Sequence, residues 1–182
     1  MASPQIMSVD APSWMNNPVP PFSFNQRMER LLRQYSMLST CPERRVSAII
    51  VGLTPHFYRI MSAGANGDLE GTLYTPLHVH KARCVHAEER AVINLPPDYR
   101  RYPIISFSSL APCYNCAKTL FKAGTRLHIY LDLYDDNTGV NFFLDEGVPV
   151  YRFRRYLQAI DPNITPTFSW QNQKGRFWGE TA

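Results

Sequence analysis

Several features are missing from this 182-residue chain, and each absence narrows what it can be. No apolar run approaches the roughly 20 residues that a membrane-spanning helix needs. The N-terminus has neither the charged start nor the apolar core of a signal peptide. We therefore expect a soluble protein of the cytoplasm.

Charge and cysteine are scarce as well. The 19 basic residues exceed the 15 acidic ones by four, which suits an anionic substrate but is too mild to indicate nucleic-acid binding by itself. The chain has four cysteines, two of them in C-x-x-C spacing, which favours metal binding in a reducing compartment over a disulfide framework. With 45% hydrophobic residues, the chain can form one globular domain with a substantial core.

Composition divides the chain into three segments. Residues 1–22 are rich in proline, which favours extended backbone, so we expect an irregular arm that is either a loose tail or docks through Trp14 and Met15. Residues 23–160 form the expected domain. Residues 161–182 carry Phe168, Trp170, Phe177 and Trp178, and we expect this aromatic tail to pack on the domain or on an oligomer partner.

Hydrophobic periodicity predicts an α/β fold. We expect an amphipathic helix capped by Ser23, an antiparallel hairpin, and then strands that alternate with helices. The expected strands are 46–51, 57–61, 104–110, 127–133 and 147–153, and the later helices are 83–95, one opened by Pro112, and 141–146. Two β-α-β passages require parallel neighbours, so the prediction is a three-layer α/β/α sandwich around a five-stranded mixed sheet.

The stretch from Cys84 to Lys118 contains three good ligands for a borderline-soft metal. They are His86, Cys113 and Cys116, and the two thiols are separated by two residues. Three nitrogen and sulfur ligands leave a fourth position free for water, which is typical of a catalytic zinc site. A helix that starts at Pro112 would also place both thiols near a helix N-terminus, where the dipole stabilises thiolates.

Glu88 follows His86 by two positions. If both residues lay on one helix they would be about 200° apart around its axis, but a glutamate in the first turn can still reach the same cavity. A carboxylate that lies beside a metal site without ligating is placed to move protons.

The pattern H-x-E followed by P-C-x-x-C resembles the signature of zinc-dependent nucleobase deaminases. Further segments resemble the deoxycytidylate deaminase family over roughly residues 28–153. These segments are Ser39 to Val51 with its Thr-Cys-x-x-Arg wording, Ile60 to Gly67, Val85 to Glu88, Pro112 to Lys118, Ala123-Gly124, Tyr130, Tyr134-Asp135 and Gly147-Val148.

The resemblance implies hydrolytic deamination of dCMP to dUMP, which supplies thymidylate synthesis. It implies a zinc ion ligated by His86, Cys113 and Cys116, with Glu88 moving protons. Asn66 matches a family position that holds the sugar and phosphate end of the nucleotide, and Tyr134 matches a tyrosine near the substrate. The family also implies a homo-oligomer, commonly a hexamer, with dCTP as activator and dTTP as inhibitor.

Three positions depart from the family wording. Arg90 replaces an asparagine, Ala65 replaces a tyrosine and Ser47 replaces a glycine. Arg90 could meet the 5′-phosphate as a bidentate donor, or it could point to solvent. The departures concern the identity of the nucleotide and its regulation, not the metal chemistry.

A second group of metal-type side chains consists of Cys41, His78, His80 and Cys84. Two imidazoles and two thiols complete a tetrahedron without an open position, as in structural zinc sites, and some phage deoxycytidylate deaminases resemble this arrangement. The alternative is that the cysteines are small buried residues and the histidines lie on a surface loop.

Two other functions stay open at the level of sequence. A deaminase acting on single-stranded nucleic acid would need aromatic side chains beside a basic channel. Such a pattern occurs in Arg100, Arg101, Arg152, Arg154 and Arg155, interleaved with Tyr99, Tyr102, Tyr151 and Phe153. The other alternative is a catalytically idle nucleotide sensor, which the intact catalytic set disfavours.

Overall fold

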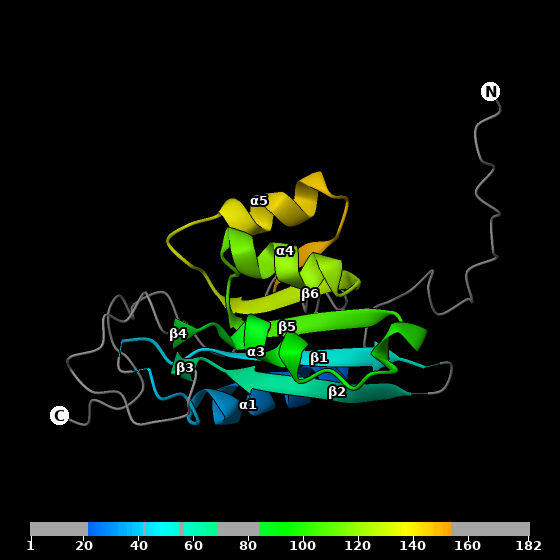
Figure 1. The fold of residues 1–182 in the computed structure, drawn as a ribbon, viewed down its shortest axis with the longest axis horizontal. Helices are drawn as coiled ribbons and strands as arrows, with labels where there is room; N and C mark the ends of the chain where they lie inside the picture. The colour runs from blue at the N-terminus through cyan, green and yellow to red at the C-terminus, as the bar shows by residue number, and fades with distance from the viewer. Residues whose placement is uncertain (1–21, 42, 55–56, 69–83, 154–182) are drawn as a thin grey trace.

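The computed structural model describes residues 22–41, 43–54, 57–68 and 84–153 (Figure 1). Residues 1–21 of the expected N-terminal arm, the aromatic tail, and His78 and His80 lie outside these residues, whereas Phe22 is the first residue of a helix. In the described part of the chain, no helix is long and apolar enough to cross a membrane.

A five-stranded mixed sheet with the order β2-β1-β5-β6-β7 forms the centre of the fold. The first three strands in this order pair antiparallel, and β5, β6 and β7 pair parallel. The strands are β1 (Ser47–Leu53), β2 (Tyr58–Ala65), β5 (Ile104–Leu110), β6 (Thr125–Asp132) and β7 (Val150–Arg152). Every residue of β1 is buried, as expected for a strand covered on both faces.

Helices cover both faces of this sheet. Helix α1 (Phe22–Ser36) packs on one face, where Met28 and Leu32 join a core that includes Phe107. Helices α3 (Ala87–Ile93), α4 (Tyr114–Lys122) and α5 (Thr138–Asp145) supply residues to the core on the other face. The predicted three-layer α/β/α sandwich with a five-stranded mixed sheet is confirmed.

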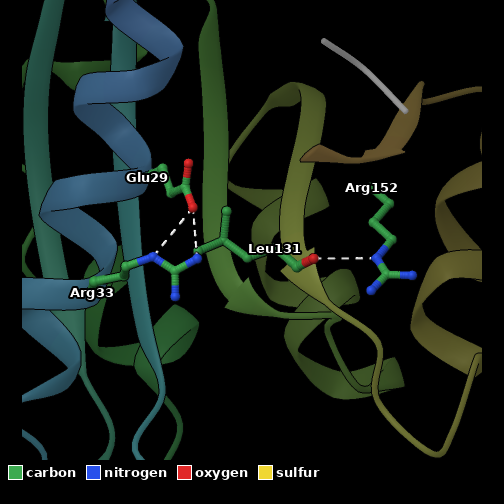
Figure 2. A network of polar contacts seen from close by, with 4 residues as sticks. All are labelled: Glu29, Arg33, Leu131 and Arg152. Carbon is green, nitrogen blue, oxygen red and sulfur yellow. Dashed lines mark hydrogen bonds and ion pairs between the residues drawn. The ribbon is translucent and has the colours of Figure 1, made fainter. Parts of the chain in front are cut away.

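The amphipathic first helix is present, although Ser23 lies inside α1 and does not cap it. On its outer surface Arg33 donates to Glu29 at 2.6 and 3.2 Å, an i,i+4 pair shown in Figure 2. Figure 2 also shows Arg152 of β7, whose Nε donates to the carbonyl oxygen of Leu131 at 3.3 Å. That bond adds a side-chain contact to the ladder between β6 and β7.

Two helix starts were placed too early by the sequence patterns. Helix α3 was expected from Arg83 but begins at Ala87, because Cys84–Val85 forms strand β4 and pairs antiparallel with strand β3, Gly67–Asp68. Helix α4 begins at Tyr114, so Pro112 precedes the helix. A short 3₁₀ helix, η1 (Tyr99–Arg101), follows α3.

Candidate metal centre and its pocket

Two helix starts bring the predicted metal ligands together. His86 is the residue before α3 and Cys113 is the residue before α4, and both have extended backbone, with ψ of 152° and 168°. Cys116 is the third residue of α4. Because α3 and α4 pack side by side, two segments about 30 residues apart in the chain meet at one point.

The three side chains are in direct contact. His86 Nδ1 lies 3.2 Å from Cys116 Sγ and 3.6 Å from Cys113 Sγ. All three ligand atoms lie within 4.8 Å of one another, and among the described residues this is the group of His, Cys, Asp or Glu side chains that could hold a metal ion.

This donor set fits zinc. With a Zn–N bond of about 2.0 Å and a Zn–S bond of about 2.3 Å at tetrahedral angles, a nitrogen and a sulfur ligand lie about 3.6 Å apart. The two observed nitrogen–sulfur distances, 3.2 and 3.6 Å, approach that value. The three residues would therefore hold zinc after small adjustments, with one tetrahedral position left over.

The protein groups alone already favour a thiolate here. The pKa of Cys113 falls to about 4, chiefly because Cys116 donates a hydrogen bond to it, and also because of His86. The pKa of Cys116 is raised by that same contact and by burial, whereas the hydrogen bond with Cys113 raises the pKa of His86. The charge is thus concentrated on one sulfur beside an imidazole, which suits a cation.

Glu88 lies on the second residue of α3 and is only 3% exposed. Because His86 precedes the helix, the 200° separation expected on a continuous helix does not apply, and the carboxyl group contacts Cys116. Burial raises the pKa of Glu88 to about 7. A carboxyl group with this pKa can both accept and donate a proton at neutral pH.

A pocket opens onto this group. Its lining includes His86, Glu88 and Cys113, together with residues from two other parts of the chain. The remaining lining residues are Arg44, Val46, Asn66, Cys84, Ala87, Leu110, Ala111 and Tyr134. Asn66 and Tyr134, which were predicted to contact the substrate, thus lie on the same pocket as the metal ligands.

Asn66 is buried, and most of its amide is engaged within the protein. Its Oδ1 accepts from Ser39 Oγ at 2.6 Å and from the Val46 amide at 2.8 Å, and its Nδ2 donates to the Arg44 carbonyl at 2.7 Å. Asn66 therefore fixes the segment that carries Arg44 and Val46 along the pocket.

Arg90 lies away from the pocket lining. Its guanidinium donates to the carbonyl oxygens of Asp68, at 2.7 Å, and Gly67, at 3.4 Å. These contacts tie α3 to β3, so in this structure the side chain neither points to solvent nor reaches the pocket.

Arg44 was not singled out from the sequence, although it belongs to the Thr-Cys-x-x-Arg segment. Its guanidinium lies 5.2 Å from the centre of the Tyr134 ring and donates to Asp135 at 2.9 Å. Its position beside the metal ligands depends on contacts across about 90 residues of chain, and the Thr-Cys-x-x-Arg wording does not show which residues it contacts.

Cys41 and Cys84, from the second predicted group, lie together. Their thiols share a hydrogen bond, and burial and the Cys41 neighbour raise the pKa of Cys84 to about 11. The structure therefore brings together the two cysteines of the predicted structural site, while its two histidines lie outside the described residues.

Comparison with known proteins bears on the family. The sequence profile of the cytidine and deoxycytidylate deaminase zinc-binding region matches residues 24–131. A search of curated proteins by sequence found no match.

Solved structures of similar fold include dCMP deaminase from the cyanophage S-TIM5. Its complex with dCMP and dUMP has a TM-score of 0.62 at 20% identity, covering 73% of this chain and 98% of that one. The apo form has a TM-score of 0.56 at 20% identity, covering 73% of this chain and 99% of that one. With more than half of its length matched by the profile, the chain belongs to the cytidine and deoxycytidylate deaminase family.

Proposed function

We propose that this protein catalyses the hydrolytic deamination of dCMP to dUMP, with release of ammonia, and so supplies thymidylate synthesis. The observation that carries the proposal is the contact of His86, Cys113 and Cys116 beside a buried Glu88, at a pocket that also exposes Arg44. The first four residues account for the chemistry, and Arg44 accounts for a phosphorylated substrate.

The three ligand residues would hold zinc. When bound, zinc lowers the pKa of a coordinated water to about 7 and so supplies a nucleophile at neutral pH. The ligands come from two helix starts packed on one sheet, so their spacing is set by the core and not by a mobile loop.

Glu88 would move the protons. In the net reaction the C4–N4 bond of cytosine breaks, a C4–O bond forms, and the exocyclic nitrogen leaves as ammonia. Glu88 would accept a proton from the attacking water and donate it to N3, then accept the remaining O–H proton from the oxygen on C4 and deliver it to the departing nitrogen. Its raised pKa supports both roles, because neither protonation state is strongly favoured near pH 7.

Arg44 supports a nucleotide over a nucleoside. Arg44 is the one arginine or lysine among the described residues that line the pocket, and its side chain is partly exposed. Its existing partner, Asp135, is 87% exposed, so solvent screens this ion pair and a phosphate dianion could replace it at small cost. A guanidinium can meet phosphate oxygens through two parallel hydrogen bonds.

A polynucleotide substrate receives less support. Arg100 and Arg101 of the interleaved basic set lie on η1, and neither these residues nor Arg152 line the pocket. Arg152 instead bonds to the main chain of β6. Arg154 and Arg155 lie outside the described residues.

Turnover distinguishes these substrates. The zinc-loaded protein is incubated with dCMP, dCTP, deoxycytidine and a cytosine-containing oligonucleotide, and loss of cytosine absorbance is followed. The proposal expects dCMP to have the highest kcat/KM and Glu88→Gln to lower kcat at least about 100-fold. Preference for the oligonucleotide, or no turnover of any of the four, would refute it.

We also propose a second, structural zinc held by Cys41, Cys84, His78 and His80. The contact between the two thiols supports it, since a tetrahedral site requires them to be neighbours. Metal analysis of purified protein should then give two zinc ions per chain. A ratio of one, unchanged in a Cys41→Ser variant, would exclude the second site.

The family resemblance further supports a homo-oligomer, commonly a hexamer, with dCTP as activator and dTTP as inhibitor. Light scattering after size-exclusion chromatography gives the assembly size. Initial rates at subsaturating dCMP, with and without each triphosphate, test the regulation.

A further inference from the structure

His128 is a fully buried polar residue on the same face of the sheet as the metal centre. It lies on β6 at 0% exposure, and its ring stacks on Phe143 of α5, with centroids 5.2 Å apart. Nδ1 lies 2.8 Å from Ser106 Oγ, and Nε2 lies 3.2 Å from Ser108 Oγ. Both serines belong to the neighbouring strand β5 and are at most 1% exposed.

The direction of every proton in this network follows from its last member. Ser108 Oγ lies 2.6 Å from the carbonyl oxygen of Leu110, which can only accept. A hydroxyl has one proton, so Ser108 donates it to Leu110 and must accept from Nε2–H of His128. Complete burial disfavours a charged ring, so the imidazole is neutral, its Nδ1 is unprotonated, and Nδ1 accepts from the Ser106 hydroxyl. The network runs from Ser106 through His128 and Ser108 to Leu110, with a neutral imidazole.

Leu110 is the last residue of β5, and the chain beyond it leads directly to a metal ligand. Leu110 and Ala111 line the pocket, and Cys113 follows two residues later. The Ala111 amide donates to the Asp132 carbonyl at 2.8 Å. The connection between β5 and α4 is thus held at two adjacent points, one by Ser108 and one by the end of β6.

We propose that Ser108 and His128 are positioning residues that hold the main chain at Leu110 and thereby keep the Cys113 thiol in register with His86 and Cys116. His128 acts by accepting from Ser106 and donating to Ser108, which fixes the Ser108 hydroxyl toward the Leu110 carbonyl. The relevance to catalysis rests on the proposed function; the effect on metal affinity does not.

Ser106 provides a matched control for Ser108. Ser106→Ala and Ser108→Ala each remove one hydroxyl that hydrogen-bonds to the His128 ring, and both serines lie on the same strand and face. Of the two, Ser108 is the one that also donates to the Leu110 carbonyl. Both variants should be less stable than the wild type. Removing residues that orient metal ligands typically lowers metal affinity about 10- to 100-fold, and we expect a loss of this size for Ser108→Ala alone.

Metal affinity is measured with Co²⁺ in competition with a chelator, at a temperature where both variants are folded. The thiolate-to-cobalt absorption reports on Cys113 and Cys116 without substrate. Hydrogen exchange at the Ala111 amide provides a second measurement, and it should quicken in Ser108→Ala more than in Ser106→Ala. Equal affinity losses in the two variants, or equal exchange rates at Ala111, would overturn the proposal.

The two proposals fail in different ways. A protein that binds Co²⁺ through its thiolates and shows the predicted difference between the serine variants, yet turns over no cytosine compound, would refute the proposed function and support the positioning role. Turnover of dCMP together with unchanged cobalt affinity in Ser108→Ala would support the proposed function and refute the positioning role.

Discussion

His128 should make the stability of the protein depend on pH. The imidazole is fully buried with no acidic neighbour among its hydrogen-bond partners, and burial lowers its pKa to about 3. In the unfolded chain the pKa returns to about 6.5. Between these values the unfolded state binds a proton that the folded state does not, so the free energy of unfolding falls as pH falls below about 6.5.

The size of the effect follows from the two pKa values. Between pH 7 and pH 5 the His128 contribution to the free energy of unfolding decreases by about 2 kcal/mol. Glu88 has the opposite sign, because its raised pKa lets the folded state bind a proton between about pH 7 and pH 4.5. The two effects oppose each other, so a flat profile for the wild type alone would be uninformative.

The decisive comparison is between the wild type and His128→Gln under identical metal conditions. Glutamine keeps a donor and an acceptor but does not titrate, and the Glu88 term cancels between the two proteins. Urea unfolding is followed by far-ultraviolet circular dichroism, since all three tryptophans, at positions 14, 170 and 178, lie outside the described residues.

The wild type should lose about 2 kcal/mol more than His128→Gln between pH 7 and pH 5. If the two proteins lost the same stability, within about 0.5 kcal/mol, the imidazole would not be held neutral by burial. The assignment of protons along the network from Ser106 to Leu110 would then be wrong.

Other substitutions test the site itself. Glu88→Gln should lower kcat at least about 100-fold while Co²⁺ affinity stays within a few-fold, because the carboxyl group moves protons and is not a ligand; equal losses in both would make it a ligand. Arg44→Gln should raise KM for dCMP about 10- to 100-fold but leave deoxycytidine unaffected. Gly139→Ala should weaken Co²⁺ binding and stability by about 1–3 kcal/mol, unlike Asn141→Ala on the exposed side of α5.

Local patterns were enough to predict much of the fold. The alternation of expected strands and helices indicated the sheet and its layers, and the predicted bounds of β5, Ile104 to Leu110, agree with the observed ones. Helix starts were less certain, since the periodicity of residues 83–95 does not reveal that Cys84 and Val85 pair with Gly67 and Asp68.

The metal ligands were predictable because His86, Cys113 and Cys116 lie in two short motifs, H-x-E and P-C-x-x-C, whose residue types and spacing are typical of a zinc site. The role of Arg44 was not predictable, because its place on the pocket depends on the Tyr134 ring and on the three hydrogen bonds that join Asn66 to Ser39, Arg44 and Val46. The Thr-Cys-x-x-Arg wording places this arginine in a segment that resembles the family, but it does not reveal these long-range contacts.

Two glycines show how the sheet and helices set the geometry of the centre. A Cβ at Gly64 of β2 would overlap the Ala87 carbonyl at the start of α3, and one at Gly139 of α5 would overlap the carbonyls of Pro112 and Cys113. The absence of a side chain at Gly64 thus allows β2 to lie close to the start of α3. Each ligand-bearing helix start therefore rests against a position without a side chain. Since His86 and Cys113 are the residues at these two starts, the ligand spacing is determined by backbone contact as much as by the motif itself.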